Sequence, residues 1–186
     1  MNNSKIIKLE RYMSYLLRHH PEDLNLNMDN CGWVKLDELI TKLNESKKYS
    51  ENITKDTIFE IVKTSNKKRF DTEEYNNDIY IRANQGHSIP VDLNLKPICP
   101  PDILYHGTAD RFSKSIDENG ILKMSRQYVH LSSDIETAKQ VGMRHGNCFI
   151  YKVAAGKMYR EGYKFYLSKN NVWLTDFVPN LYIEKI

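Results

Sequence analysis

The sequence lacks the features of a membrane protein and of a disulfide-rich secreted one. None of its apolar runs approaches the length of a bilayer-spanning helix, and the start, Met1-Asn2-Asn3-Ser4, has no apolar signal-peptide core. Its cysteines, Cys31, Cys99 and Cys148, are few, odd in number and far apart, so no pair has metal-ligand spacing. We therefore expect reduced thiols, a cytoplasmic location and no membrane partner.

Excess charge of one sign is also lacking. The 186 residues have a formal net charge of +3, from 27 Lys and Arg against 24 Asp and Glu. Residues 1–92 carry net −1 and residues 93–186 net +4. This balance is too mild for a tight, sequence-blind nucleic-acid binder, which has a pI above about 9 and a basic stripe. A small polyanionic ligand or a short stretch of RNA fits better.

The first 88 residues predict three helices followed by a β-hairpin. Apolar residues recur at helical spacing over residues 6–17 and 36–43, and Thr54 is a suitable N-cap for a third helix. Residues 69–82 contain an Asn-rich turn and the alternation Ile79-Tyr80-Ile81-Arg82, which is typical of a hairpin. Three small helices and a hairpin are the plan of a winged-helix domain.

A second, different region follows a proline-containing segment. Residues 89–101 contain four prolines and no helical period, which predicts a linker between domains 1–88 and 102–186. The last region has short segments rich in aromatic and β-branched residues. Two helices, 112–119 and 135–143, interrupt them. The chain is therefore predicted to have an α+β fold in two lobes.

Four short stretches concentrate Arg and His beside apolar residues. They are Leu17-Arg18-His19-His20-Pro21, Lys67-Lys68-Arg69-Phe70, Gln85-Gly86-His87-Ser88 and the segment 125–132, which contains Arg126 and His130. Arg binds phosphate oxygens bidentately and keeps its charge at neutral pH. A fifth motif, His106-Gly107-Thr108, ends a predicted strand and offers groups able to hydrogen-bond ribose hydroxyls or an amide. These patterns indicate a protein that handles a phosphate on a nucleic acid.

Eight segments in order along the chain resemble the KptA-type RNA 2′-phosphotransferases. They are Ser14-Tyr15-Leu16-Leu17-Arg18-His19 with Pro21, Gly32-Trp33-Val34, Lys68-Arg69-Phe70, Arg82-Ala83-Asn84-Gln85-Gly86-His87-Ser88, Leu104-Tyr105-His106-Gly107-Thr108, Arg126 with Val129-His130-Leu131-Ser132, Gly142-Met143-Arg144-His145-Gly146, and Val172-Trp173-Leu174-Thr175. The resemblance implies a winged-helix lobe joined to an ADP-ribosyltransferase-like lobe. It also implies removal of an internal 2′-phosphate from RNA with NAD as co-substrate.

The implied chemistry has two steps. The RNA 2′-phosphate attacks C1″ of the NAD ribose and expels nicotinamide, which leaves RNA joined through phosphate to ADP-ribose. The ribose O2″ then attacks phosphorus and releases 2′-hydroxyl RNA and ADP-ribose 1″,2″-cyclic phosphate. By the resemblance, Arg18, His19, Arg69 and Arg126 serve the second step, in a cleft between lobes.

The resemblance also assigns binding residues. The NAD set is His106, Gly107, Thr108, His130, Ser132 and Arg144. Arg18, Arg69, Gln85, His87 and Arg126 are assigned to RNA. Segment 172–175 offers no Glu of the kind that many ADP-ribosyltransferases use, which favours a phosphate acceptor over a protein one. No metal is expected, because the arginines supply the positive charge.

Plainer interpretations stand beside these assignments. Arg18 can simply satisfy the last carbonyls of its helix, Arg69 can belong to a solvated charge run, and His87 can anchor the linker. Two other functions remain open: ADP-ribosylation of terminal phosphates on nucleic acids, and non-catalytic binding of RNA or DNA. The physiological RNA is not identified by the sequence, and a monomer is expected.

Overall fold

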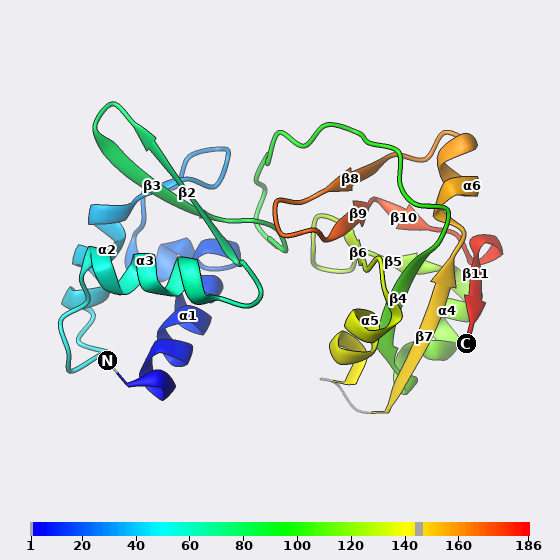
Figure 1. Ribbon diagram of the computed structural model, residues 1–186, viewed down its shortest axis with the longest axis horizontal. Coiled ribbons are helices and arrows are strands. Elements are labelled where there is room, and N and C mark those ends of the chain that lie inside the picture. Colours follow the sequence, from blue (N-terminus) through cyan, green and yellow to red (C-terminus); the bar gives the residue numbers. More distant parts are fainter. Residues whose placement is uncertain (1, 144–146) are drawn as a thin grey trace. The chain divides into compact units, whose positions relative to one another are not determined.

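The computed structural model describes residues 2–143 and 147–186, in two compact units (Figure 1). The first unit comprises residues 1–94 and the second residues 95–186, so the division falls inside the proline-containing segment 89–101. Each unit has its own core of buried apolar side chains. Within the described residues, none of the helices combines the length and apolar character needed to cross a bilayer.

The first unit combines three α-helices with one small sheet. Its elements are α1 (Asn3–Arg18), the 3-10 turn η1 (Pro21–Leu24), β1 (Val34–Lys35), α2 (Leu36–Glu45), α3 (Lys55–Thr64), β2 (Phe70–Tyr75) and β3 (Asp78–Ala83). The strands pair antiparallel in the order β1-β3-β2. The three helices and the hairpin predicted from the sequence are confirmed, and β1 adds a third strand to the hairpin.

Local chemistry explains where these elements begin and turn. The Thr54 hydroxyl accepts a hydrogen bond from the Thr57 N–H at 3.3 Å, which confirms the predicted N-cap of α3. Asn76 and Asn77 both adopt positive φ, 50° and 64°, in the tight turn between β2 and β3. Asn tolerates this left-handed conformation better than most residues, so a two-residue hairpin turn forms without glycine.

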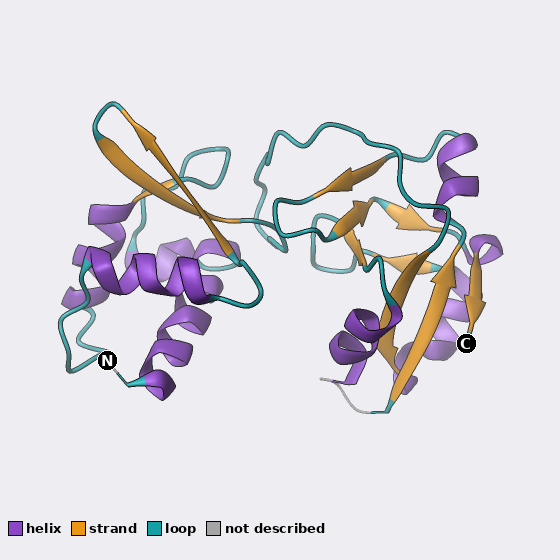
Figure 2. Ribbon diagram, viewed as in Figure 1, coloured by secondary structure: helices purple, strands orange, loops and turns teal. Residues whose placement is uncertain are grey.

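The second unit has more strands than helices (Figure 2). Its elements are β4 (Leu104–Ala109), η2 (Asp110–Phe112), α4 (Ser113–Asn119), β5 (Ile121–Leu122), β6 (Val129–Leu131), α5 (Ile135–Gly142), β7 (Cys148–Val153), α6 (Ala155–Arg160), β8 (Phe165–Leu167), β9 (Trp173–Thr175), β10 (Phe177–Val178), η4 (Asn180–Tyr182) and β11 (Ile183–Lys185). The prediction of two helices here was incomplete, because α6 is a third. Helix α6 has only six residues and begins with Ala155-Gly156, so its sequence is too short to show a helical period.

Two three-stranded sheets organise this unit, in the orders β11-β7-β4 and β6-β9-β8. A backbone bridge joins them, because Tyr105 and Ser132 exchange N–H···O=C hydrogen bonds of 2.8 Å in both directions. The remaining strands, β5 and β10, form a separate pair. The overall class is therefore α+β, as predicted.

Helix α5 packs unusually close to β4, and Gly107 is the reason. A Cβ built on Gly107 would lie 1.8 Å from the Ala138 carbonyl oxygen, and one built on Gly142 would lie 2.9 Å from the Thr108 nitrogen. Backbone therefore touches backbone where the helix crosses the strand. Any side chain at Gly107 must push α5 away.

We expect Gly107→Ala to destabilise the second unit by about 2 kcal/mol or more, through this overpacking. Urea unfolding followed by circular dichroism measures the change. The contrasting variant is Gly162→Ala, whose Cβ meets nothing within 4 Å although its φ is +96°. It carries only the conformational cost of about 1 kcal/mol. Equal losses in the two variants would contradict the packing argument.

Candidate functional site

In the first unit, residues 86–88 close against the end of α1. The Ser88 N–H donates to the Arg18 carbonyl at 3.0 Å, and the Ser88 hydroxyl lies 2.9 Å from His19 Nδ1. A Cβ on Gly86 would lie 3.7 Å from an Arg18 terminal nitrogen, so the guanidinium passes over this glycine. The structure thus brings His87 close to Arg18 and His19, which lie almost 70 residues earlier in the chain.

His87 lies inside this cluster rather than on its surface. Its side chain has 0% exposure, and neither ring nitrogen has a hydrogen-bond partner among the described residues. Burial, and to a smaller extent the positive charges of Arg18, His19 and Arg82, together lower the pKa of His87 to about 4. The ring is therefore neutral and has no surface for the predicted RNA contact. The alternative interpretation, in which His87 anchors the linker, fits its burial.

Arg69 is held by a carboxylate on α1. Its guanidinium forms an ion pair with Glu10, whose carboxylate also accepts a hydrogen bond from Ser65, and the two paired side chains are only 18% and 14% exposed. The Asn84 amide donates to the carbonyls of Lys68 and Phe70 at 2.7 and 3.2 Å and so fixes the backbone on both sides of Arg69. Arg69 is therefore a positioned side chain and not part of a solvated charge run.

The Glu10 and Asn84 contacts were not predicted. Glu10 is 59 residues from Arg69, and it sits on the predicted helix as one polar residue among several. Asn84 lies in the motif 82–88, but nothing in the sequence shows that its side chain is buried and bonded to the carbonyls on both sides of Arg69.

The second unit contains a cavity of about 390 Å³. Four of the predicted site residues line it: His106 and Thr108 from β4, Arg126 from the loop after β5, and His130 from β6. Alternation along β4 explains this placement. Because Gly107 faces α5, its neighbours His106 and Thr108 point to the opposite side of the strand.

The His106 ring has a defined orientation. Its Nδ1 lies 3.0 Å from the His130 carbonyl oxygen and donates a proton to it, which leaves Nε2 as the acceptor. Burial lowers the pKa of His106, the Arg126 charge lowers it further, and the bond to His130 opposes both. A neutral imidazole with a free acceptor nitrogen is suited to a hydroxyl or amide donor of a ligand.

The other predicted NAD residues differ in what the structure says about them. The Ser132 backbone is engaged by Tyr105, as described above. The lack of a side chain at Gly107 makes room for the backbone of α5. Arg144 and its neighbour His145 lie outside the described residues. Gln85, which was assigned to RNA, is half-buried.

A guanidinium–imidazole cluster in one unit, and a cavity lined by imidazoles and a guanidinium in the other, are features of a protein that binds a phosphorylated ligand. Comparison with known families makes this specific. The chain belongs to the RNA 2′-phosphotransferase, Tpt1 / KptA family, whose model matches residues 4–177. The resemblance inferred from eight segments is thereby confirmed.

Individual relatives match over almost their full length. A probable RNA 2′-phosphotransferase of Fusobacterium nucleatum is 50% identical, over 96% of this chain and 97% of the relative. Proteins of the same description from Nostoc punctiforme and Flavobacterium johnsoniae are 45% and 48% identical, over at least 98% of each chain.

The burial of His87 predicts a pH-dependent stability. Between pH 6.5 and about 4 the unfolded chain takes up a proton that the folded protein refuses, so stability falls as pH falls through this window. The full loss is about 3 kcal/mol. His87→Leu should remove this part of the pH dependence, measured by urea unfolding at pH 7 and pH 4.5. The control, His20→Gln, alters an exposed histidine. Parallel pH profiles for wild type and His87→Leu would contradict the assignment.

Proposed function

We propose that this protein removes an internal 2′-phosphate from RNA and uses NAD as the acceptor, through a 2′-phospho-ADP-ribosyl RNA intermediate. The products would be 2′-hydroxyl RNA, nicotinamide and ADP-ribose 1″,2″-cyclic phosphate. The observation that carries the proposal is membership of the 2′-phosphotransferase family over residues 4–177. The arrangement of His106, Arg126 and His130 around one cavity supports the NAD part.

The proposal includes the architecture. The order α1-β1-α2-α3-β2-β3 with the sheet β1-β3-β2 supports a winged-helix domain in the first unit. The second unit would be the ADP-ribosyltransferase-like part that binds NAD. We further propose that the protein acts as a cytoplasmic monomer.

The residues around the cavity fit a dinucleotide. Its volume of about 390 Å³ lies within the usual range of ligand pockets, roughly 300–1,000 Å³. His106 Nε2 and the Thr108 hydroxyl would hydrogen-bond ribose or amide groups, and Arg126 would face phosphate oxygens. NAD would supply a ribose carbon with a good leaving group and a neighbouring hydroxyl as the final phosphate acceptor.

The side chains of the first unit would serve the phosphate. Arg18 and Arg69 present guanidiniums that stabilise charge developing on the non-bridging oxygens, so the reaction requires no metal ion. Of the four residues assigned to the second step (Arg18, His19, Arg69 and Arg126), His19 is the one that can move a proton near neutral pH. We assign it acid–base assistance. The Ser88 hydroxyl, 2.9 Å from His19 Nδ1, helps to orient the ring.

The decisive test is incubation with an oligonucleotide that bears one internal 2′-phosphate, with NAD and a metal chelator. We expect nicotinamide and the cyclic phosphate in equal amounts and a 2′-hydroxyl oligonucleotide by mass spectrometry. An oligonucleotide whose terminal phosphate keeps ADP-ribose would establish the alternative transferase activity. Absence of turnover, with no NAD affinity by calorimetry, would leave a non-catalytic binder.

His19→Ala and Arg69→Ala should stall the reaction at the RNA–ADP-ribose adduct. Loss of one preorganised donor typically slows such a step by about a hundredfold or more. Quenched single-turnover reactions resolved by gel electrophoresis measure adduct and product separately. The matched control is Arg160→Ala, which removes a guanidinium that is 68% exposed and paired with Asp102. Fast, complete product formation by both site variants would remove the roles assigned to them.

A further inference from the structure

Aromatic rings follow one line along α1 and its C-cap. Tyr12, Tyr15 and His19 stand at positions i, i+3 and i+7. The buried side of α1 packs into the core with Leu9, Met13, Leu16 and Leu17, and the half-buried Tyr12 packs against the edge of this core. Tyr15 is exposed, and because the solvent side of an amphipathic helix ordinarily carries charged and polar groups, its ring there requires a reason.

These rings belong to a longer series of contacts, here called the aromatic row. In spatial order its members are Tyr49, Tyr12, Tyr15, His20 and His19, and the successive ring centroids are 6.4, 6.2, 4.7 and 6.5 Å apart. Tyr12 and Tyr15 lie within 13° of parallel, and Tyr15 and His20 within 26°. The row ends at His19, the proposed acid–base residue.

Hydrogen bonds hold the middle of the row in place. The Tyr15 hydroxyl donates to Asp23 at 3.0 Å, and the His20 ring pairs with Glu22 at 3.0 Å. Tyr15 nevertheless remains 39% exposed, and His20 is also exposed. The Tyr15 and His20 rings are therefore preorganised and still accessible, which lowers the entropy cost of binding a ligand.

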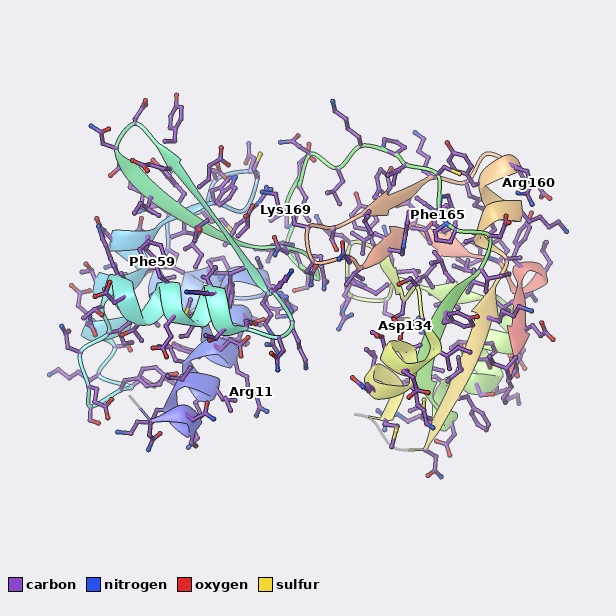
Figure 3. All side chains as sticks on the ribbon, viewed as in Figure 1. Arg11, Phe59, Asp134, Arg160, Phe165 and Lys169 are labelled. Carbon is purple, nitrogen blue, oxygen red and sulfur yellow. The ribbon has the colours of Figure 1, made fainter. Side chains whose placement is uncertain are left out.

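Exposed cations lie at the other end of the row. The Lys48 ammonium sits 3.5 Å from the centroid of the Tyr12 ring. Arg11, which is also exposed, extends from the preceding position of α1, about 100° around the helix from Tyr12 (Figure 3). Ring faces for bases combined with cations for the backbone are what proteins use to bind single-stranded nucleic acids. A duplex buries its base faces within its own stack, so it has none to offer to the row.

We propose that the aromatic row binds the unpaired bases beside the 2′-phosphate of the RNA substrate and leads the strand to His19. This inference rests on the proposed function and adds a substrate preference to it. A 2′-phosphate in a single-stranded segment is processed better than the same group within a duplex.

The test compares Tyr15→Ala with Tyr15→Phe on a single-stranded 2′-phosphorylated oligonucleotide. Base–aromatic stacking is worth about tenfold in affinity for one base, so Tyr15→Ala should raise KM by about that factor with little change in kcat. Tyr15→Phe loses the bond to Asp23 and keeps the ring, so it should keep the wild-type KM. Tyr75→Ala, which removes a 65% exposed tyrosine from the hairpin, is the control.

A second substrate separates stacking from structural damage. When the flanking nucleotides are abasic, wild type should lose about the same tenfold, and Tyr15→Ala should lose nothing further. An unchanged KM in Tyr15→Ala, or an equal loss on both substrates, overturns the inference. If wild type turns over neither substrate, the proposed function fails. Fluorescence anisotropy with the labelled single strand then still tests the row, because Tyr15→Ala must bind it about tenfold more weakly than wild type.

Discussion

The contact between Ser88 and the end of α1 is the interaction on which the first unit's candidate site depends. One residue uses its N–H to satisfy a terminal helix carbonyl and its hydroxyl to meet the His19 ring. Because the last carbonyls of a helix have no partner within it, a distant segment can bind there without competing with the helix itself. The same closure buries His87 and places the Arg18 guanidinium over Gly86.

The Arg69 guanidinium of this unit is held by the Glu10 carboxylate, which also neutralises its charge. The guanidinium of Arg69 and the carboxylate of Glu10 are only 18% and 14% exposed, so this ion pair is largely removed from water. These contacts fix the orientation of Arg69, because Glu10 holds its guanidinium and Asn84 holds the backbone on both sides of it. Arg69 would therefore lose little conformational entropy on binding a ligand. His87 remains uncharged in this unit. A protonated His87 ring would add a positive charge close to those of Arg18, His19 and Arg82.

The sequence predicted the elements that local patterns determine. Residues 6–17 and 36–43 form helices, Thr54 caps α3, and the Asn-rich turn joins β2 to β3. The sequence did not predict α6, because the six residues of this helix are too few to show a helical period. Pairings between distant strands, such as β1 with β3 and β7 with both β4 and β11, follow from three-dimensional packing and not from local pattern.

For the candidate site too, the sequence predicted features that depend on residue type and missed those that depend on contacts between distant residues. Residue types and the family resemblance identified His106, Thr108, Arg126 and His130, which the structure places around one cavity. The sequence contained no sign that His87 is fully buried or that Glu10 holds Arg69, because both facts depend on residues far away in the chain.

The two faces of strand β4 make different contacts, and these contacts depend on the register of β4 against β7. Gly107 admits the backbone of α5 on one side, while His106 and Thr108 line the cavity on the other. A slip of a single residue against β7 would exchange the two faces. An imidazole would then be driven into the α5 backbone and a bare glycine turned toward the cavity. Gly107 therefore fixes the register of β4. The pairing with β7 that allows the α5 backbone to pack against β4 is also the pairing that directs His106 toward the cavity.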